Sequence, residues 1–161
     1  MRNSDLNDFH NIYVVVAAVG NESGHITLRN QNFRDKARLS ISLESMNDRP
    51  QAFRVPMMRL ADLMDESGDQ SVRLLKVDVE GYEPEVIRGA GSELRKIENL
   101  VLEILPDCMG KVEITSMLNR LTENGFTLCD IYGAAWEQGS SLPENNLLAT
   151  RVDGSAPSLG G

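Results

Sequence analysis

The chain is poor in aromatic and basic residues. It holds one Trp, three Tyr and four Phe, and its 16 Lys and Arg are outnumbered by 24 Asp and Glu, which gives a formal net charge of −8. A nucleic-acid surface needs a basic stripe, and a base-stacking platform needs grouped aromatic rings. The composition therefore argues against a nucleic-acid partner.

Cysteine and histidine are equally scarce. The two cysteines, Cys108 and Cys129, lack C-x-x-C spacing, and the two histidines, His10 and His25, lie apart in the sequence. Two thiols are too few for a disulfide framework, so we expect free cysteines that are at least partly buried. With so few nitrogen and sulfur ligands a zinc site is not expected, and we predict no bound metal.

Long hydrophobic runs are missing as well. The most apolar stretches, residues 13–19 and 100–105, fall well short of the roughly 18 residues that a membrane helix needs. Residues 1–8 are polar and acidic, unlike a secretory signal or a transit peptide. We therefore expect a cytoplasmic protein without a membrane partner.

The chain does contain enough material for a folded domain. Hydrophobic residues make up 41% and charged residues 25% of its 161 residues, which suits one domain with a substantial core. We assign residues 1–151 to that domain. Residues 152–161 are small and polar, and we predict that they form a disordered tail.

Apolar patterns predict strands of several kinds. Continuous apolar runs indicate strands buried on both faces at residues 12–19 and 72–79, whereas alternation indicates half-exposed strands at 25–29 and 39–43. Residues 53–57 are predicted to form an edge strand because Pro56 cannot donate to a ladder. Further strands are predicted at 100–105, 127–132 and 146–151.

Helices are predicted between these strands, at 60–68, from Pro84 through Leu94, and around 114–121. From residue 72 onward strands and helices alternate, so the sequence predicts an α/β sheet with parallel strands that is closed by an antiparallel pair. Ligands of such sheets bind beyond the carboxyl ends of the strands. Polar residues at those ends are therefore the first candidates for function.

Charged side chains stand at one such end. Lys76, Asp78 and Glu80 alternate along an apolar strand, which places them on one face, and Glu103 lies within the next predicted strand. A parallel neighbour would bring Glu103 near the Asp78 end. The acids could form a metal site, an acid/base pair or hydrogen-bond acceptors for a ligand hydroxyl. They could also be structural, with Lys76 paired to Asp78, Glu80 capping a helix, and Glu103 paired to a nearby Lys or Arg.

The most specific pattern covers residues 74–90. This run, LLKVDVEGYEPEVIRGA, closely resembles the FkbM-type S-adenosylmethionine-dependent methyltransferases, and three further stretches, 12–28, 55–63 and 100–104, agree with the family in order and spacing. The resemblance covers about residues 7–150. It implies a class I methyltransferase fold, which is a Rossmann-like, doubly wound α/β sheet. It also implies methyl transfer from S-adenosylmethionine to a hydroxyl oxygen of a sugar, a polyketide or another small molecule.

The resemblance implies roles for single residues. Asp78 would lie nearest the substrate and the methyl donor, Glu80 would act as base or orient the hydroxyl, and Lys76 would hold the carboxylates ionised. Gly81 would let the backbone approach the ligand. The expected cofactor contacts are Ala17, Ala18, Asp78 and Val79.

Two departures from the family pattern stand out. Ala61 occupies the place where the family usually has the first Asp of its Asp-Asp pair. The family's Gly-rich cofactor turn precedes its third strand, which residues 12–19 resemble, but the chain contains no G-x-G-x-G run. We therefore expect a truncated C-terminal part of the domain that lacks the first two strands and leaves strand edges unpaired.

Three interpretations follow from the sequence. The chain is a truncated FkbM-type methyltransferase, or it is a non-catalytic binding or assembly module that forms homo-oligomers through its exposed strand edges. A third interpretation is a carboxylate hydrolase that uses Asp78 and Glu80. The methyl acceptor is not readable, because specificity would lie in loops such as 30–46 and 133–145.

Overall fold

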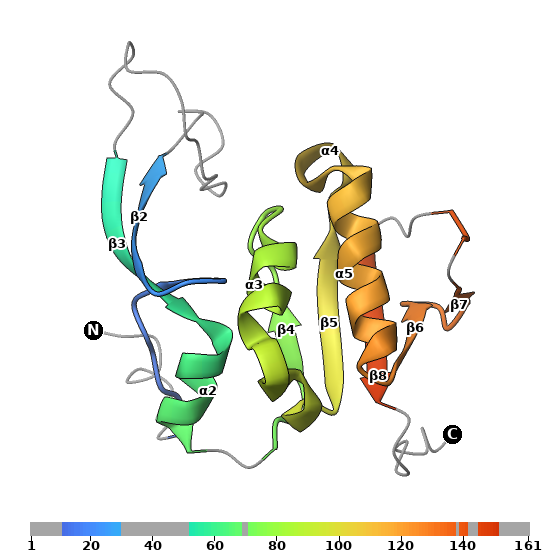
Figure 1. Cartoon of the computed structure of the whole chain (residues 1–161), viewed down its shortest axis with the longest axis horizontal. Coiled ribbons are helices and arrows are strands. Elements are labelled where there is room, and N and C mark those ends of the chain that lie inside the picture. Colours follow the sequence, from blue (N-terminus) through green and yellow to red (C-terminus); the bar gives the residue numbers. More distant parts are fainter. Residues whose placement is uncertain (1–10, 30–51, 69–70, 138, 142–144, 152–161) are drawn as a thin grey trace.

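The described part of the protein consists of two β-sheets and the helices packed against them (Figure 1). The computed structural model describes residues 11–29, 52–68, 71–137, 139–141 and 145–151. Strands and helices alternate along much of this chain, so the predicted α/β class is confirmed in this general form.

The first sheet has three strands in the order β1-β3-β2. Strand β1 (Ala18–Gly20) runs parallel to β3 (Ala52–Arg59), and β2 (Gly24–Arg29) runs antiparallel to β3. Helix α2 (Leu60–Ser67) follows β3 directly and ends at Gly68, whose φ of 70° lies in the left-handed region that glycine tolerates best. The sequence predicted this helix with its correct end.

The second sheet has five strands in the order β4-β5-β8-β6-β7. Strands β4 and β5 are parallel, and the remaining neighbours are antiparallel, as predicted for a sheet closed by antiparallel strands. The strands are β4 (Leu75–Val77), β5 (Asn99–Ile104), β6 (Phe126–Asp130), β7 (Ala135–Trp136) and β8 (Asn145–Arg151). The helical segments after β4 are α3 (Glu83–Ala90), the 3-10 helix η1 (Gly91–Lys96), α4 (Pro106–Met109) and α5 (Lys111–Glu123).

The hydrophobic core lies between the five-stranded sheet and helices α3 and α5, which lie on the same face of that sheet (Figure 1). Burial alternates along β5, so Leu100, Leu102 and Ile104 face the helices. Helix α5 contributes its predicted stripe of buried residues to this core: Ile114, Met117, Leu118 and Leu121. A doubly wound sheet needs helices on both faces, and that finer feature stays a prediction.

The strand predicted at residues 12–19 is mostly wrong. Only Ala18–Gly20 is a strand, and the apolar residues before it are exposed: Ile12, Tyr13, Val14, Val15 and Val16. Within the described residues β1 pairs with β3 alone and only over these three positions. High β-propensity does not make a strand when no neighbouring strand accepts its hydrogen bonds.

The edge position predicted for residues 53–57 is also wrong. Strand β3 is the centre of its sheet and has β1 on one side and β2 on the other. Pro56 lies opposite His25 of β2, but the ladder to β1 begins only at Met57. Pro56 therefore has one partner strand, which is how the central strand accommodates a residue without an N–H.

The segment predicted as a buried strand at 72–79 is shorter and more exposed. Strand β4 covers Leu75–Val77, an isolated bridge joins Val72 to Ile97, and Leu74 is exposed. In the described structure β5 is the one strand that pairs with β4, so β4 forms an edge of the sheet. The apolar residues of β4 therefore do not lie in a central strand that is buried on both faces.

Smaller differences concern helix and strand ends. The predicted helix through Leu94 is α-helical only to Ala90, because Gly91, at a φ of 53°, starts the 3-10 segment. Strand β6 ends at Asp130, and Ile131 and Tyr132 are exposed. Both cysteines are free as predicted, but Cys108 is exposed.

Some predictions concern parts of the chain outside the described residues. They are the strand at 39–43, the loop at 30–46, the tail at 152–161 and residue His10. Among the helices that are described, none has the length and apolar character that crossing a membrane requires.

Candidate functional site

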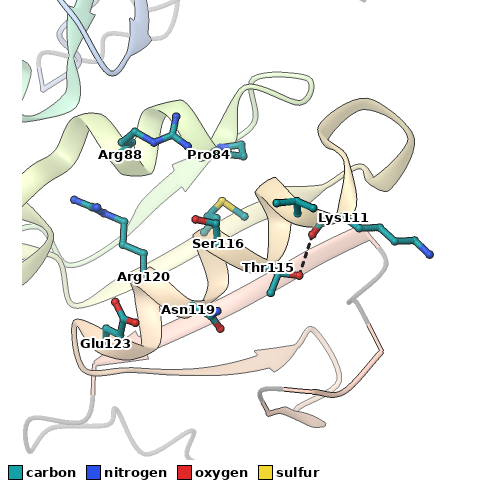
Figure 2. Close-up of a pocket in the computed structure, with 10 residues that line it drawn as sticks. Pro84, Arg88, Lys111, Thr115, Ser116, Asn119, Arg120 and Glu123 are labelled. Carbon is teal, nitrogen blue, oxygen red and sulfur yellow. Dashed lines mark hydrogen bonds between the residues drawn. The ribbon is translucent and has the colours of Figure 1, made fainter.

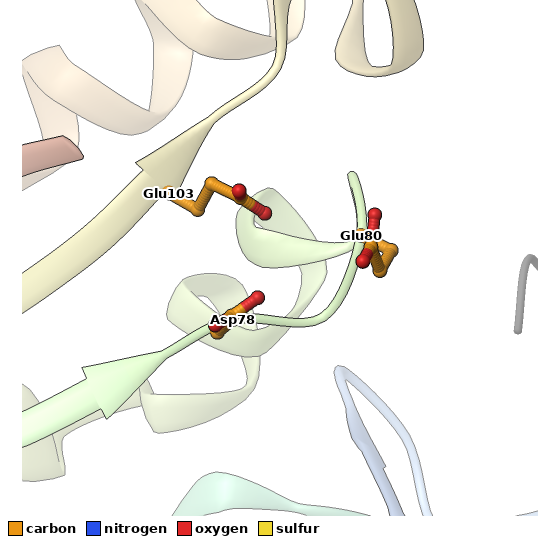
Figure 3. Close-up of side chains that lie close together, drawn as sticks. All are labelled: Asp78, Glu80 and Glu103. Atoms are coloured by element: carbon orange, nitrogen blue, oxygen red, sulfur yellow. The ribbon is translucent and has the colours of Figure 1, made fainter. Parts of the chain in front are cut away.

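Three carboxylates meet where strands β4 and β5 end. In the parallel register Val77 lies opposite Leu102, so Asp78 and Glu103 extend this row at the carboxyl end of the sheet. Asp78, Glu80 and Glu103 each place an oxygen so that these oxygens lie within 4.8 Å of one another (Figure 3). Glu103 reaches the site from β5, Asp78 follows β4 directly, and Glu80 stands on the next turn. The structure thus brings Glu103 to the Asp78 end, as the sequence predicted.

The turn that carries Glu80 has an uncommon backbone. Glu80 has a φ of 55° and Gly81 has a φ of 101°. A left-handed conformation is unfavourable for a non-glycine residue and persists only where the surroundings hold it. The strict alternation expected from Lys76 through Glu80 therefore ends after Asp78, and this turn, rather than a strand, sets the position of the Glu80 carboxylate.

Gly81 has a structural reason to be glycine. A Cβ atom at this position would lie 2.8 Å from the Cβ of Cys108, at the surface of α4. Together with the positive φ, this contact requires glycine for the turn and for packing on α4. The expectation that Gly81 serves the approach of a ligand is not needed to explain the residue.

Glu83 is a fourth acid beside the cluster, and the sequence analysis missed it. It is the first residue of α3, its exposed fraction is 0%, and its Oε1 accepts a hydrogen bond of 2.9 Å from the backbone N–H of Val79. Its Oε2 has no hydrogen-bond partner within the described structure. The one signal in the sequence was the density of acids around Pro84, and such density usually marks a solvated surface.

Lys76 neutralises part of the cluster. Its Nζ lies 2.5 Å from Oδ2 of Asp78, so the predicted structural pairing of these two residues is confirmed. This hydrogen bond is the main cause that holds the pKa of Asp78 below its usual value, and it raises the pKa of Lys76. Asp78 is therefore ionised at neutral pH.

Glu103 has the opposite electrostatic environment. Burial is the main cause that raises its pKa, and the neighbouring charges of Asp78, Glu80 and Glu83 raise it further. Its Oε2 is buried without a hydrogen-bond partner among the residues that the structure describes. The prediction that Glu103 pairs with a Lys or Arg is not confirmed, because the charged groups that act on its carboxyl are the acids Asp78, Glu80 and Glu83. Asp78 and Glu103 form an acidic pair whose members differ in their affinity for a proton.

The expected cofactor contacts fall into two groups. Val79 is half-buried and lies in the turn between Asp78 and Glu80. Ala17 and Ala18, also half-buried, lie just before and within β1, which belongs to the other sheet and packs against α3. Asp78 and Val79 thus lie at the carboxylate site. The cofactor-binding role of all four residues, including Ala17 and Ala18, stays a prediction.

A cavity of about 610 Å³ lies between helices α3 and α5 (Figure 2). Its lining comes from both helices: Pro84, Arg88, Lys111, Val112, Thr115, Ser116, Met117, Asn119, Arg120 and Glu123. None of the four carboxylates described above lines it. One of its basic residues, Arg88, is paired with Glu85 and Glu113. The cavity therefore has no part in the carboxylate site.

Comparison with known proteins gives one match. A family model described as a methyltransferase FkbM domain matches residues 4–128, which is most of the chain and includes all four carboxylates. A search of curated proteins and a search of solved structures found no match.

Proposed function

The chain belongs to the FkbM methyltransferase family, and from this premise we propose that it transfers a methyl group from S-adenosylmethionine to the hydroxyl oxygen of a small molecule or sugar. The observation that carries the proposal is the meeting of Asp78, Glu80 and Glu103 at the carboxyl ends of β4 and β5. Ligands of α/β sheets bind at this end, and hydroxyl chemistry needs acceptors of this kind there.

The carboxylate site fits the charged part of the cofactor. S-adenosylmethionine carries a sulfonium and an ammonium group, and Asp78, Glu80 and Glu103 bring carboxylate oxygens together at one place. Glu103 also leaves a buried oxygen without a hydrogen-bond partner in the described part of the chain. The residues that would hold the cofactor are Asp78 and Val79, with Ala17 and Ala18 from the other sheet. When bound, the cofactor supplies an electrophilic methyl group.

The protein's own residues would then position the acceptor hydroxyl and assist the loss of its proton. Asp78, kept ionised by Lys76, accepts the hydrogen bond of the hydroxyl and aligns its oxygen. Glu80, fixed by its left-handed backbone, is the second acceptor and the candidate base. Glu103, whose raised pKa favours the protonated form, is suited to hold a proton next to Asp78.

The same proposal includes the class I methyltransferase architecture. It is supported by the parallel pair β4 and β5, by the α3 crossover that joins them, and by the antiparallel strands that close the sheet. A cytoplasmic location is part of the proposal too, since Cys108 and Cys129 are both free.

Titration calorimetry with S-adenosylmethionine, followed by a methyl-transfer assay on a panel of sugar and polyketide hydroxyls, tests this function. Asp78→Asn should lower the transfer rate by about 10²–10⁴-fold. Glu66→Gln is the matched control, because Glu66 is an exposed carboxylate on α2. Activity that survives Asp78→Asn at the wild-type level would contradict the assignment, as would a folded protein that does not bind the cofactor.

A second candidate function is a non-catalytic assembly module that forms homo-oligomers. It is favoured by the exposed apolar residues 12–16, among them Tyr13 with 94% of its surface exposed, and by the unpaired edge of β4 in the described structure. Sedimentation at micromolar concentration tests it. Tyr13→Ser should shift oligomers toward monomers, whereas Val112→Ser, at an exposed apolar position on α5, should not. A wild-type chain that sediments as a monomer rules this function out.

A further inference from the structure

We propose that Glu83 is a positioning residue of the carboxylate site, because it fixes the backbone at Val79, between Asp78 and Glu80, and brings a buried negative charge to that turn. The positioning follows from the contacts of Glu83 alone. Only its consequence for methyl transfer rests on the proposed function.

The contact of Glu83 with the backbone is specific. Its Oε1 accepts a hydrogen bond of 2.9 Å from the N–H of Val79, and the carbonyl oxygen of Val79 accepts one of 3.4 Å from the N–H of Tyr82. Both backbone groups of Val79 are therefore bonded within the chain. A contact of Val79 with the cofactor would thus come from its side chain, while its backbone ties the turn to the start of α3.

The turn after Val79 needs such a tie. Glu80 has a φ of 55° and Gly81 has a φ of 101°. A left-handed backbone at a non-glycine residue persists only where the surroundings hold it, and the hydrogen bond from Val79 holds the residue directly before Glu80. Loss of this bond should therefore displace the carboxylates that flank Val79.

The charge of Glu83 is its second contribution. The side chain is fully buried, and burial of a carboxylate costs free energy of folding, although its place in the first turn of a helix offsets part of that cost. A glutamine could accept the same hydrogen bond without any charge to bury. The hydrogen bond alone therefore does not explain why this residue is a carboxylate.

Glu103 is the group on which the charge of Glu83 acts. Burial is the main cause that raises the pKa of Glu103, and three acids raise it further: Asp78, Glu80 and Glu83. Two further groups lie near Glu103: Lys76, whose pKa is raised by Asp78 and less by Glu103, and the uncharged Asn146, opposite Glu103 in β8. In the proposed reaction, Glu83 thus helps to keep a proton on Glu103 next to Asp78.

Two NMR measurements on the full chain test the positioning without a substrate: hydrogen exchange at the Val79 amide and titration of the Glu103 carboxyl. Glu83→Leu should speed exchange at Val79 by about tenfold or more, because the N–H loses a charged acceptor. Glu83→Gln should keep this amide protected but lower the pKa of Glu103, because only the charge is lost. Glu85→Gln is the matched control, since Glu85 is the other acid in the first turn of α3 and pairs with Arg88, so neither signal should move.

The methyl-transfer assay adds a functional readout. The limb of the pH profile where kcat falls as Glu103 loses its proton should move to lower pH in Glu83→Gln. The KM for S-adenosylmethionine should stay near the wild-type value in this variant, because the turn at Val79 is still held. A residue with only a structural role would leave the pH profile in place.

The outcomes separate this proposal from the proposed function. If Glu83→Leu leaves exchange at Val79 unchanged, or Glu83→Gln leaves the pKa of Glu103 unchanged, the positioning role is wrong even if S-adenosylmethionine binds. If both NMR signals change as expected but calorimetry detects no cofactor, the positioning stands and the methyltransferase function is contradicted. Circular dichroism identifies a misfolded Glu83→Leu, and in that case Glu83→Gln, which keeps the size of the side chain and its acceptor oxygen, decides.

Discussion

Replacing Gly89 by alanine tests the contact between helix α3 and strand β1. Gly89 lies near the end of α3, where alanine would ordinarily stabilise a helix by about 1 kcal/mol relative to glycine. A Cβ atom at this position, however, would lie 1.9 Å from the carbonyl oxygen of Gly20 and 2.8 Å from its carbonyl carbon. The two effects have opposite signs, so their sizes decide the outcome.

The steric effect should be the larger one. Ordinary contact with a Cβ begins at 3.4 Å, so the backbone at Gly20 would have to move by 3.4 − 1.9 = 1.5 Å. Backbone cannot turn aside as a side-chain end can, and overpacking of this kind costs about 1–3 kcal/mol or more. Because the clash is with rigid backbone, we expect the upper part of this range, about 2–3 kcal/mol. After the gain of about 1 kcal/mol in helix propensity, the free energy of unfolding should fall by about 1–2 kcal/mol.

Urea unfolding followed by far-UV circular dichroism measures this change, and the Tm should fall by roughly 2–8 °C. Gly24→Ala is the control, because a Cβ there meets nothing within 4 Å. Its stability should stay within about 0.5 kcal/mol of the wild type. Since β1 carries Ala18, Gly89→Ala should also weaken binding of S-adenosylmethionine. A Gly89→Ala protein as stable as the wild type, or more stable, would refute the reasoning.

Two further predictions concern other parts of the fold. Arg151 donates hydrogen bonds to the carbonyl oxygens of Leu94, Ile97 and Asn124. Arg151→Met should therefore lower the free energy of unfolding by about 2–4 kcal/mol in urea titrations. A loss below about 0.5 kcal/mol, the range of ordinary surface substitutions, would contradict this role. The hydrogen bonds from Arg59 and then Ser23 lower the pKa of Asp62 from 3.8 to about 2. Because the folded pKa is the lower one, the stabilisation from Asp62 is complete above pH 3.8 and is lost as the pH falls toward about 2. An NMR titration of the Asp62 carboxyl that gives a value near 3.8 would show that these hydrogen bonds do not persist in solution.

Local patterns were enough to predict several elements. The stripe of Ile114, Met117, Leu118 and Leu121 predicted α5, and the alternating or apolar runs predicted β5 and β8, because the period of burial is written into neighbouring residues. The run at residues 74–90 pointed to the family that the comparison then matched. These features depend on a short stretch of chain.

Other features depended on neighbours that a local pattern does not contain. Residues 12–16 have the composition of a buried strand but are exposed, and Pro56 looks like an edge residue but lies in a central strand. In both cases the deciding fact is which strand lies beside the segment and where its ladder begins. Hydrogen-bonded neighbours come from distant parts of the chain, so propensity alone could not identify them.

For the candidate site too, some features follow from the sequence and others only from the tertiary structure. The sequence by itself determined that Lys76, Asp78, Glu80 and Glu103 are out of place in apolar strands, and that the ends of those strands are where function should lie. Only the tertiary structure decided that three carboxylates converge within 4.8 Å and that Glu83 is buried beside them. The physical reason is that the parallel register of β4 and β5 and the left-handed turn at Glu80 set these distances, and both depend on the packing of α3 and α4 around the strand ends.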